Sequence, residues 1–521
     1  MKSNVIILFL VLNLIFKIIF IAGPFEHFDA AAFPDDTYIS LYLAKNIADG
    51  NGPLYTTGYT NGFQPMYVFL CVPFYLIFDE DKIKPVYAAL IMLMIFDCLS
   101  LIMILNIVNL FTQNKYSLTI SALFWITSPY IVLTSMNGLE TIISFFFIVS
   151  SFYYFFKKRN NFINEKGYKN LIILGILCGL AVFSRIDNGI LALVILLFII
   201  TDRIKNKNDY RQIVKSGLIY SCFVILTILP WLIYSFVYTG EIIQSSGEAV
   251  RYQNWSLKNY FQVFSGEQVE LIVYGFRIAL IKNLPLILGC VTCVIILLYK
   301  KKKVNFSFLK GKLVDLLPLI LFCALLFCSY VFYVYGMWFF KRYFFPFVFL
   351  FIMLLSLLTD SALKSFENSS SRKKFMIIIS AMLLIINFTR YDFIELYINK
   401  NNKTDLGYRA IGEWVSKNFK AGTIIGAMQS GAIAYFSDSI KVINLDGVVN
   451  KDALISIKNK DLMGYVKKMN IDYIVGWNIN NEYLVRESLN FNNKDLTKVL
   501  TINGFETWSR EWSVYKVNYI K

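Results

Sequence analysis

Long apolar runs are the feature that most constrains how this chain can fold. A helix that crosses a bilayer needs about 20 mainly apolar residues. Eleven stretches of the 521 residues reach or approach that length, at 4–22, 86–111, 118–135, 141–156, 170–183, 188–201, 216–238, 278–299, 313–335, 343–360 and 375–391. With 57% hydrophobic residues, the chain has too much apolar surface for a soluble protein of this size. The sequence therefore predicts an all-α polytopic membrane protein with about 11 transmembrane helices.

Basic residues predict the direction of the crossings. The five loops that would share one side hold 21 Lys and Arg against four acids, which is typical of cytoplasmic loops. The first loop of the other side, 23–85, reverses this balance with eight acids and three lysines. The pattern requires the short run 66–79, which contains Pro73, to dip into the outer interface without crossing. Because the net charge of +16 lies mostly in these short loops, we expect no nucleic-acid partner.

Hydropathy falls sharply after residue 391, and the pattern becomes that of a soluble domain. We expect residues 1–391 to form the transmembrane domain and 392–521 a small extracytoplasmic α/β domain on the same side as 23–85. In this domain the sequence predicts a helix at 407–418 and strands at TIIGAM, KVINL and DYIVGW, followed by two strands around an Asn-Gly turn within 498–517. All eight cysteines lie in apolar segments, so neither disulfides nor a cysteine-bound metal is expected.

Two adjacent carboxylates, Asp35 and Asp36, directly follow Pro34 in the first outer loop. An ionised group at bilayer depth costs about 2.5 to 3.5 kcal/mol, so acids beside a membrane segment usually face a cavity, a partner or a reaction. Asp36 can cap a helix that begins at Thr37. That leaves Asp35 free, and we predict it to be a general base that activates a hydroxyl. His27 is the only histidine, so a site with several histidine ligands is excluded. The remaining possibility for a metal is a divalent cation bound by the carboxylates of Asp35 and Asp36.

Polar residues farther along the chain are candidates for the walls of a cavity. The stretch GNGPLYTTGYTNGFQP, with Tyr59 and Gln64, has the turns and hydroxyl groups of a sugar-lined loop and equally those of an ordinary irregular loop. Glu140 stands at the outer mouth between two predicted helices, where it is either a helix-end acid or part of the cavity. We expect the outer loop 239–277, with Trp255, Arg251 and Lys258, to cover the site.

Four charged residues at the outer ends of helices are candidates for holding a lipid phosphate or for lining the cavity. The planar fork of Arg185 suits a phosphate, although Arg185 can equally pair with Asp187. Lys341 and Arg342 stand together among aromatic residues, and their alternative role is snorkelling to the interface. We predict that Arg185, Lys341 and Arg342 bind a donor phosphate and that Asp187 lines the cavity.

The strings DDTYISLYLAKNIADGNGPLY and GYTNGFQPMY resemble the signature of the GT-C superfamily of integral-membrane glycosyltransferases. The resemblance is closest to the branch of mycobacterial terminal arabinofuranosyltransferases, with aminoarabinose transferases and protein O-mannosyltransferases as more distant relatives. Four further patches follow in the order of that family, namely SMNGLET, GLAVFSRIDNG, KRYFFPFVF and GAMQSGAIAYFSDSIKVINLDGVVN.

This resemblance implies a GT-C fold and an inverting transfer from a polyprenyl-phosphate sugar. It assigns the base to Asp35 or Asp36 and puts Glu140 near the acceptor. It also implies that Arg342, in the family's RY-x-x-P pattern, contacts the donor phosphate. Because Gln64 departs from the family pattern, as does Ile186, the sugar and the acceptor are left open.

The function expected from the sequence is therefore a glycosyltransferase of the bacterial cell (inner) membrane with an extracytoplasmic active site. Its acceptor would be an envelope glycan, lipid or protein. One alternative is a transporter or flippase of lipid-linked glycans, which would place ionisable groups near the bilayer midplane on broken, repeated helices. The other alternative is a non-catalytic envelope protein that binds glycan.

Overall fold

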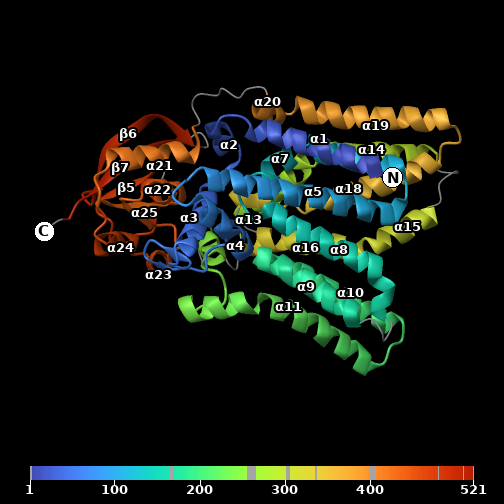
Figure 1. The fold of residues 1–521 in the computed structure, drawn as a ribbon, viewed down its shortest axis with the longest axis horizontal. Coiled ribbons are helices and arrows are strands. Elements are labelled where there is room, and N and C mark those ends of the chain that lie inside the picture. Colours follow the sequence, from blue (N-terminus) through green and yellow to red (C-terminus); the bar gives the residue numbers. More distant parts are fainter. Residues whose placement is uncertain are drawn as a thin grey trace.

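The computed structural model describes residues 3–163, 168–254, 266–300, 306–334, 337–397, 406–478, 480–507 and 510–519. A long bundle of helices is joined end to end with a smaller α/β domain (Figure 1). The N-terminus lies at the far end of the bundle, and the C-terminus lies beyond the α/β domain. The first loop lies between the bundle and the α/β domain.

The helices of the bundle follow the apolar runs of the sequence. They are α1 (Ser3–Ile21), α5 (Lys84–Thr112), α6 (Lys115–Thr127), α7 (Pro129–Ser135), α8 (Thr141–Ile163), α9 (Tyr168–Ser184), α10 (Gly189–Lys205), α11 (Tyr210–Thr239), α13 (Gly266–Lys282), α14 (Leu284–Tyr299), α15 (Phe306–Asp315), α16 (Leu317–Ser329), α18 (Phe347–Lys364) and α19 (Ser369–Thr389). Each of the eleven predicted runs falls on one of these helices or on consecutive ones, so the mainly helical, multi-pass fold is confirmed.

Among the described residues, five helical segments are long and apolar enough to cross a membrane alone, and they are α1, α5, α11, Leu317–Val334 and α18. Two bent pairs raise this number to seven: α6 with α7, at 62°, and α13 with α14, at 77°. A proline stands in the first turn of the second helix of each pair, where its missing N–H interrupts the hydrogen-bond ladder. The predicted count of eleven crossings stays a prediction.

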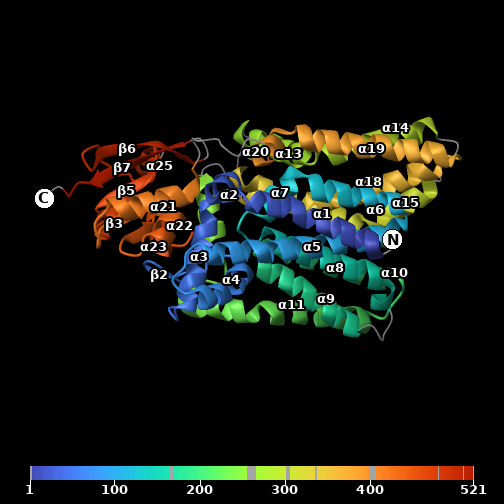
Figure 2. The same cartoon turned by 45° about the horizontal axis from the view of Figure 1, so that its top comes forward.

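The first loop is largely helical. It contains α2 (Phe25–Ala32), α3 (Asp35–Ala48), the short pair β1 (Leu54–Tyr55) and β2 (Gly58–Tyr59), and α4 (Pro65–Phe78). Both views place α3 and α4 side by side next to the α/β domain (Figures 1 and 2). At 14 residues α4 is too short to span a bilayer, which agrees with the predicted dip into the interface.

The α/β domain is built on a five-stranded sheet in the order β4-β3-β5-β7-β6. The parallel part comprises β3 (Ile424–Ala427), β4 (Lys441–Asn444) and β5 (Tyr473–Trp477), which are the three strands predicted from the sequence. The hairpin of β6 (Leu496–Thr507) and β7 (Arg510–Val517) adds the antiparallel part. The helices are α21 (Gly407–Asn418), α22 (Gly431–Phe436), α23 (Lys451–Lys458), α24 (Leu462–Lys468) and α25 (Asn480–Arg486).

The position predicted for the hairpin turn is wrong. Asn503 and Gly504 lie inside β6, where the pairing with β7 changes register between Ile502 and Glu506. Such a shift is typical of a β-bulge, which tolerates a glycine inside a strand. The strands themselves were predicted correctly because alternation of side chains is a local pattern.

The α/β domain packs directly on the first loop. Arg409 donates its backbone N–H to Asp29 at 2.8 Å, and the hydroxyls of Tyr75 and Tyr435 lie 2.8 Å apart. Lys82 and Asp438 add an ion pair at 2.6 Å. The first loop and the α/β domain are therefore on the same side of the bundle, as the sequence predicted.

Candidate active site

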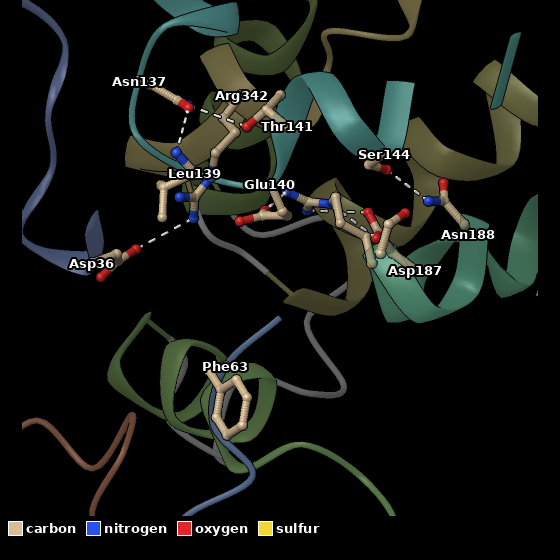
Figure 3. Close-up of polar contacts among 12 residues, drawn as sticks. Asp36, Phe63, Asn137, Leu139, Glu140, Thr141, Ser144, Asp187, Asn188 and Arg342 are labelled. Carbon is tan, nitrogen blue, oxygen red and sulfur yellow. Dashed lines mark hydrogen bonds and ion pairs between the residues drawn. The ribbon is translucent and has the colours of Figure 1, made fainter. Parts of the chain in front are cut away.

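A cavity of about 740 Å³ lies where the first loop, the helix ends and the α/β domain meet. Six of the nine site residues predicted from the sequence line it, and they are Asp36, Gln64, Glu140, Arg185, Asp187 and Arg342. Figure 3 shows Asp36, Glu140 and Phe63 around this space, each from a different element. The α/β domain contributes Val448, which follows β4.

Asp36 and Arg342 form one wall of the cavity. Asp36 lies in the first turn of α3, and Arg342 lies in the short helix α17 (Phe340–Tyr343). The Nη2 atom of Arg342 is 3.4 Å from Oδ2 of Asp36 (Figure 3). The Arg342 guanidinium also lies over the rings of Phe339 and Tyr343, at 5.0 and 5.5 Å, which hold it by cation–π contact. Its buried Nε atom has no hydrogen-bond partner among the described residues.

Arg185, in contrast, is already neutralised by two acids. Its Nη1 donates to Glu140 at 2.8 Å, and its Nε donates to Asp187 at 3.1 Å. Tyr330 accepts from Nη2 of Arg185 at 2.8 Å and donates its own hydroxyl to Asp187. Arg185 is 7% exposed and Glu140 is 3% exposed. The pairing with Asp187, which the sequence left open, is present, and a ligand phosphate would have to compete with two carboxylates for Arg185.

Glu140 lies in the turn between α7 and α8, and this turn packs closely against α3. Gly138 has a φ of +66°, and a Cβ atom at this position would lie 2.4 Å from Cγ2 of Thr37. The Thr37 hydroxyl donates to the carbonyl of Asn137 at 2.9 Å, and the Asn137 side chain accepts the N–H of Leu139. The SMNGLET turn is thus fixed against the same first turn of α3 that carries Asp36.

Asp35, which the sequence predicted to be the base, does not line the cavity. Its carboxylate accepts the backbone N–H groups of Gly431, at 2.8 Å, and Ala432, at 3.0 Å, in the α/β domain. A Cβ atom at Gly431 would lie 2.3 Å from the backbone oxygen of Asp35, so only glycine allows this approach. The prediction that Asp36 caps the helix is also wrong, because α3 begins at Asp35 and Pro34 is its N-cap.

Burial changes the proton affinity of the acids at this domain contact. Desolvation raises the pKa of Asp35 to about 7, against the lowering effect of its two backbone hydrogen bonds. Burial likewise raises the pKa of Asp446 to about 7, and the nearby charge of Asp36 adds to that rise. Asp446 follows β4, so the α/β domain brings a further carboxyl group close to Asp36.

Two other predicted residues lie outside the cavity lining. Lys341 is next to Arg342 in the sequence, but its electrostatic effects fall on Lys282 and Asp392. Tyr59 is 46% exposed and packs its ring against Tyr238, with centroids 5.1 Å apart. Neither contact could be read from the sequence, because each joins segments far apart in the chain.

The predicted carboxylate-bound cation does not fit the observed geometry. The carboxylate of Asp35 accepts backbone N–H groups while that of Asp36 faces Arg342, so the two do not converge on one point. Within the part of the chain that the structure describes, no group of three or more His, Cys, Asp or Glu side chains could hold a metal ion.

Sequence reasoning missed several residues of the cavity wall. Phe63, Tyr330 and Val448 line it. Phe63 and Val448 lie in stretches that the sequence analysis singled out, but as apolar residues they were not named, and Tyr330 lies in an apolar run. The loop predicted to cover the site does so between Gly240 and Arg251, which includes much of α12 (Ser245–Asn254). Trp255 and Lys258, named with that loop, lie outside the described residues.

Comparison with protein families gives two partial matches. The model of the dolichyl-phosphate-mannose-protein mannosyltransferase family matches residues 58–243, which include four of the cavity residues predicted from the sequence. A domain of unknown function (DUF8728) matches residues 397–515, which correspond to the α/β domain. No curated protein sequence matches the chain.

Solved structures of an archaeal oligosaccharyltransferase and of ArnT share the fold. The oligosaccharyltransferase of Archaeoglobus fulgidus, in complex with zinc and sulfate, is 16% identical over 92% of this chain and 70% of its own length, with a TM-score of 0.56. AglB from the same organism, in complex with an inhibitory peptide and a dolichol-phosphate, is 13% identical over the same shares, with a TM-score of 0.52.

ArnT from Cupriavidus metallidurans, bound to undecaprenyl phosphate, is 9% identical over 99% of this chain and 98% of its own, with a TM-score of 0.59. At these identities the likeness concerns the fold. The GT-C fold expected from the sequence is thereby confirmed. The closer resemblance to arabinofuranosyltransferases stays a prediction.

Proposed function

We propose that the protein is an inverting glycosyltransferase that transfers a sugar from a polyprenyl-phosphate donor to a hydroxyl group of an envelope glycan, lipid or protein. The observation that carries the proposal is a carboxylate and a guanidinium, Asp36 and Arg342, on one wall of a 740 Å³ cavity in a GT-C fold. The lipid phosphates named in the structures of AglB and ArnT support this class of donor.

Arg342 is the residue best placed to receive the donor phosphate. Its contact with Asp36 is long, at 3.4 Å, and its Nε has no partner among the described residues. Its N–H groups can therefore donate to a ligand. Positive charge there would stabilise the phosphate oxygen on which negative charge develops as the glycosidic bond breaks. Arg185 is a positioning residue in this proposal, because Glu140 and Asp187 already occupy its fork.

Asp36 is the proposed base. It would take the proton of the acceptor hydroxyl while the acceptor oxygen attacks the anomeric carbon. The bond from that carbon to the phosphate oxygen breaks, its electron pair leaves with polyprenyl phosphate, and the configuration inverts. A phosphate bound to Arg342 would draw the guanidinium away from Asp36 and leave the carboxylate free to accept the proton.

The proposal places the reaction on the outer face of the bacterial cell (inner) membrane. The excess of Lys and Arg in the loops at the opposite end of the bundle supports this orientation. Gln64, Glu140 and Asp187 would then form the side of the cavity nearer the acceptor. No cofactor is part of the proposed reaction.

The test is an assay of purified protein in detergent with undecaprenyl-phosphate-linked sugars and an envelope fraction as acceptor. We expect release of undecaprenyl phosphate, and we expect Asp36→Asn to lower kcat by about a hundred- to ten-thousand-fold. The KM for the donor should not rise, because the base contacts the acceptor and the substitution removes the carboxylate that competes with the phosphate for Arg342. Asp49→Asn is the matched control, since Asp49 is an exposed carboxylate at the other end of α3.

Wild-type turnover in the Asp36→Asn protein would rule out Asp36 as the base. Movement of intact lipid-linked sugar across a liposome bilayer, without release of undecaprenyl phosphate, would instead identify a flippase. Binding of glycan with neither activity would identify a non-catalytic glycan-binding protein.

A further inference from the structure

A second group of charged residues lies at the same end of the bundle as the cavity, where helices are interrupted. Lys282 ends α13 immediately before the 77° bend into α14, and Arg390 follows the last residue of α19. Asp392 lies in the first turn of α20 (Tyr391–Tyr397). Figure 2 shows α13 and α20 together at the end of the bundle that carries the α/β domain.

These residues converge on a single carboxylate oxygen. The Nζ atom of Lys282 lies 2.9 Å from Oδ2 of Asp392, and Nη2 of Arg390 lies 3.3 Å from the same oxygen. Arg390 also donates from Nη1 to the backbone carbonyl of Lys282 at 3.2 Å. The exposed Lys341 of α17 adds its positive charge to the field at both Lys282 and Asp392. We call Lys282, Arg390 and Asp392 the outer cationic cluster.

The outer cationic cluster has more positive than negative charge. Its two cations share one acid, and the side chains of Lys282 and Arg390 are only 11% and 14% exposed. Buried cations are stable only when their charge is compensated. These three residues thus leave an excess of one positive charge at the outer end of a membrane helix bundle, a position that an anion from the membrane surface can reach.

Buried polar atoms next to the cluster also require a partner. Asn283 follows Lys282 directly, and Asn387 lies one helical turn before Arg390. Both side chains are fully buried, and their Oδ1 atoms accept no hydrogen bond from any described residue. A buried amide oxygen without a hydrogen-bond donor is unfavourable. A ligand with hydroxyl groups would donate the missing hydrogen bonds to the Oδ1 atoms of Asn283 and Asn387.

The outer cationic cluster is separate from the cavity. None of its three residues lines the cavity, whereas Arg342 of α17 does. We propose that the cluster is a binding site for the phosphate-bearing headgroup of a membrane lipid. Asp392 and the carbonyl of Lys282 already engage Nη2 and Nη1 of Arg390, so a phosphate would compete with them for the guanidinium, whereas Lys282 offers a compact charge. This proposal does not depend on the proposed transferase activity.

The test measures binding of phosphatidylglycerol to delipidated protein in detergent by native mass spectrometry. Lys282→Gln and Arg390→Gln should each weaken binding about fivefold, as expected for one cation at a membrane surface. Each variant should fold, because the remaining cation still pairs with Asp392. Asp392→Asn should tighten binding, whereas a purely structural ion pair would only lose stability.

Matched controls come from ion pairs elsewhere in the bundle. Lys364→Gln and Arg159→Gln remove cations that pair with Asp360 and Asp202, at 2.6 and 2.7 Å, and should leave phosphatidylglycerol binding unchanged. Equal losses in these controls, or wild-type binding in both Lys282→Gln and Arg390→Gln, would overturn the proposal. Loss of binding in Arg342→Gln alone would assign the lipid to the cavity and would overturn it too.

Two competitors identify the source of the phosphate. If millimolar inorganic phosphate fails to displace phosphatidylglycerol, the site binds a lipid headgroup. If inorganic phosphate displaces it, the site binds a free anion, and the proposal of a lipid ligand is overturned. Displacement by undecaprenyl phosphate at equal concentration would support the site and extend it to polyprenyl lipids.

Discussion

At the scale of single residues, Asp35 and Asp36 show how neighbours in a sequence can take different roles. Successive residues of an α-helix point about 100° apart, so two adjacent acids in its first turn face different surroundings. Asp35 faces the α/β domain and accepts two of its backbone N–H groups. Asp36 faces the cavity and Arg342. The helix begins two residues earlier than the sequence indicated, and this shift exchanges the expected roles.

The raised pKa of Asp35 predicts a pH dependence of stability. A carboxyl group whose folded pKa lies above its unfolded value binds protons more tightly when folded, so stability is lost as pH rises from about 4 through about 7. Between pH 5 and pH 8 we expect the free energy of unfolding to fall by on the order of 2 kcal/mol through Asp35. Thermal unfolding of detergent-purified protein at the two pH values measures this loss.

The Asp35→Asn variant provides the control, because an amide does not titrate in this range. Its loss of stability between pH 5 and pH 8 should be smaller than that of the wild type, with the remainder due to Asp446, whose pKa is also about 7. An unchanged pH dependence in Asp35→Asn would contradict the assignment. Transfer activity at pH 5 should be largely retained in this variant, which separates Asp35 from the base.

At the scale of elements, a buried ion pair joins the first helix to the bundle. Lys17 of α1 and Asp97 of α5 lie 2.9 Å apart with both side chains fully buried. Asn13 donates to the same Asp97 oxygen at 2.6 Å, and Trp125 donates to it at 3.3 Å. Because an uncompensated charge inside a membrane bundle is costly, this pair fixes the register of α1 against α5.

Breaking this pair should destabilise the protein more than removing both charges. Lys17→Met leaves Asp97 without its counter-charge and should cost about 3 to 5 kcal/mol of stability. The double variant Lys17→Met/Asp97→Asn removes both charges and keeps an acceptor for Asn13 and Trp125, so it should recover most of the loss. Thermal unfolding in detergent compares the variants. Equal destabilisation of the single and the double variant would contradict a charge-based role.

At the scale of the whole molecule, the α/β domain closes the end of the bundle that carries the cavity. It contacts the first loop at Asp35 and contributes Val448 to the cavity wall. The loops rich in Lys and Arg belong to the opposite end of the helices, where the N-terminus lies (Figure 1). This arrangement requires the first loop and the C-terminal domain to share one side of the membrane.

Single cysteines test that arrangement in intact cells. We expect a membrane-impermeant maleimide to label Asn51→Cys, in the first loop, and Asn493→Cys, in the α/β domain. Lys207→Cys, between α10 and α11, should be labelled only after the membrane is permeabilised, since its loop is rich in basic residues. Labelling of residues 51 and 493 from opposite sides would be incompatible with the structure and with the proposed enzyme.

The sequence by itself determined the class of protein, the positions of the long apolar helices, and the strands and first helix of the α/β domain. These follow from local patterns, because a bilayer demands long apolar runs and a strand demands alternation. It also identified Asp36, Gln64, Glu140, Asp187 and Arg342 as residues around a site, since polar groups at membrane helix ends are few and usually functional.

Only the tertiary structure decided what each of those residues contacts. Asp35 binds Gly431, which lies 396 residues later, and Arg185 binds Glu140 across 45 residues. Lys341 does not line the cavity, whereas its neighbour Arg342 does. Such contacts depend on how helices and domains pack against one another, and packing brings together residues that no local pattern of the sequence relates.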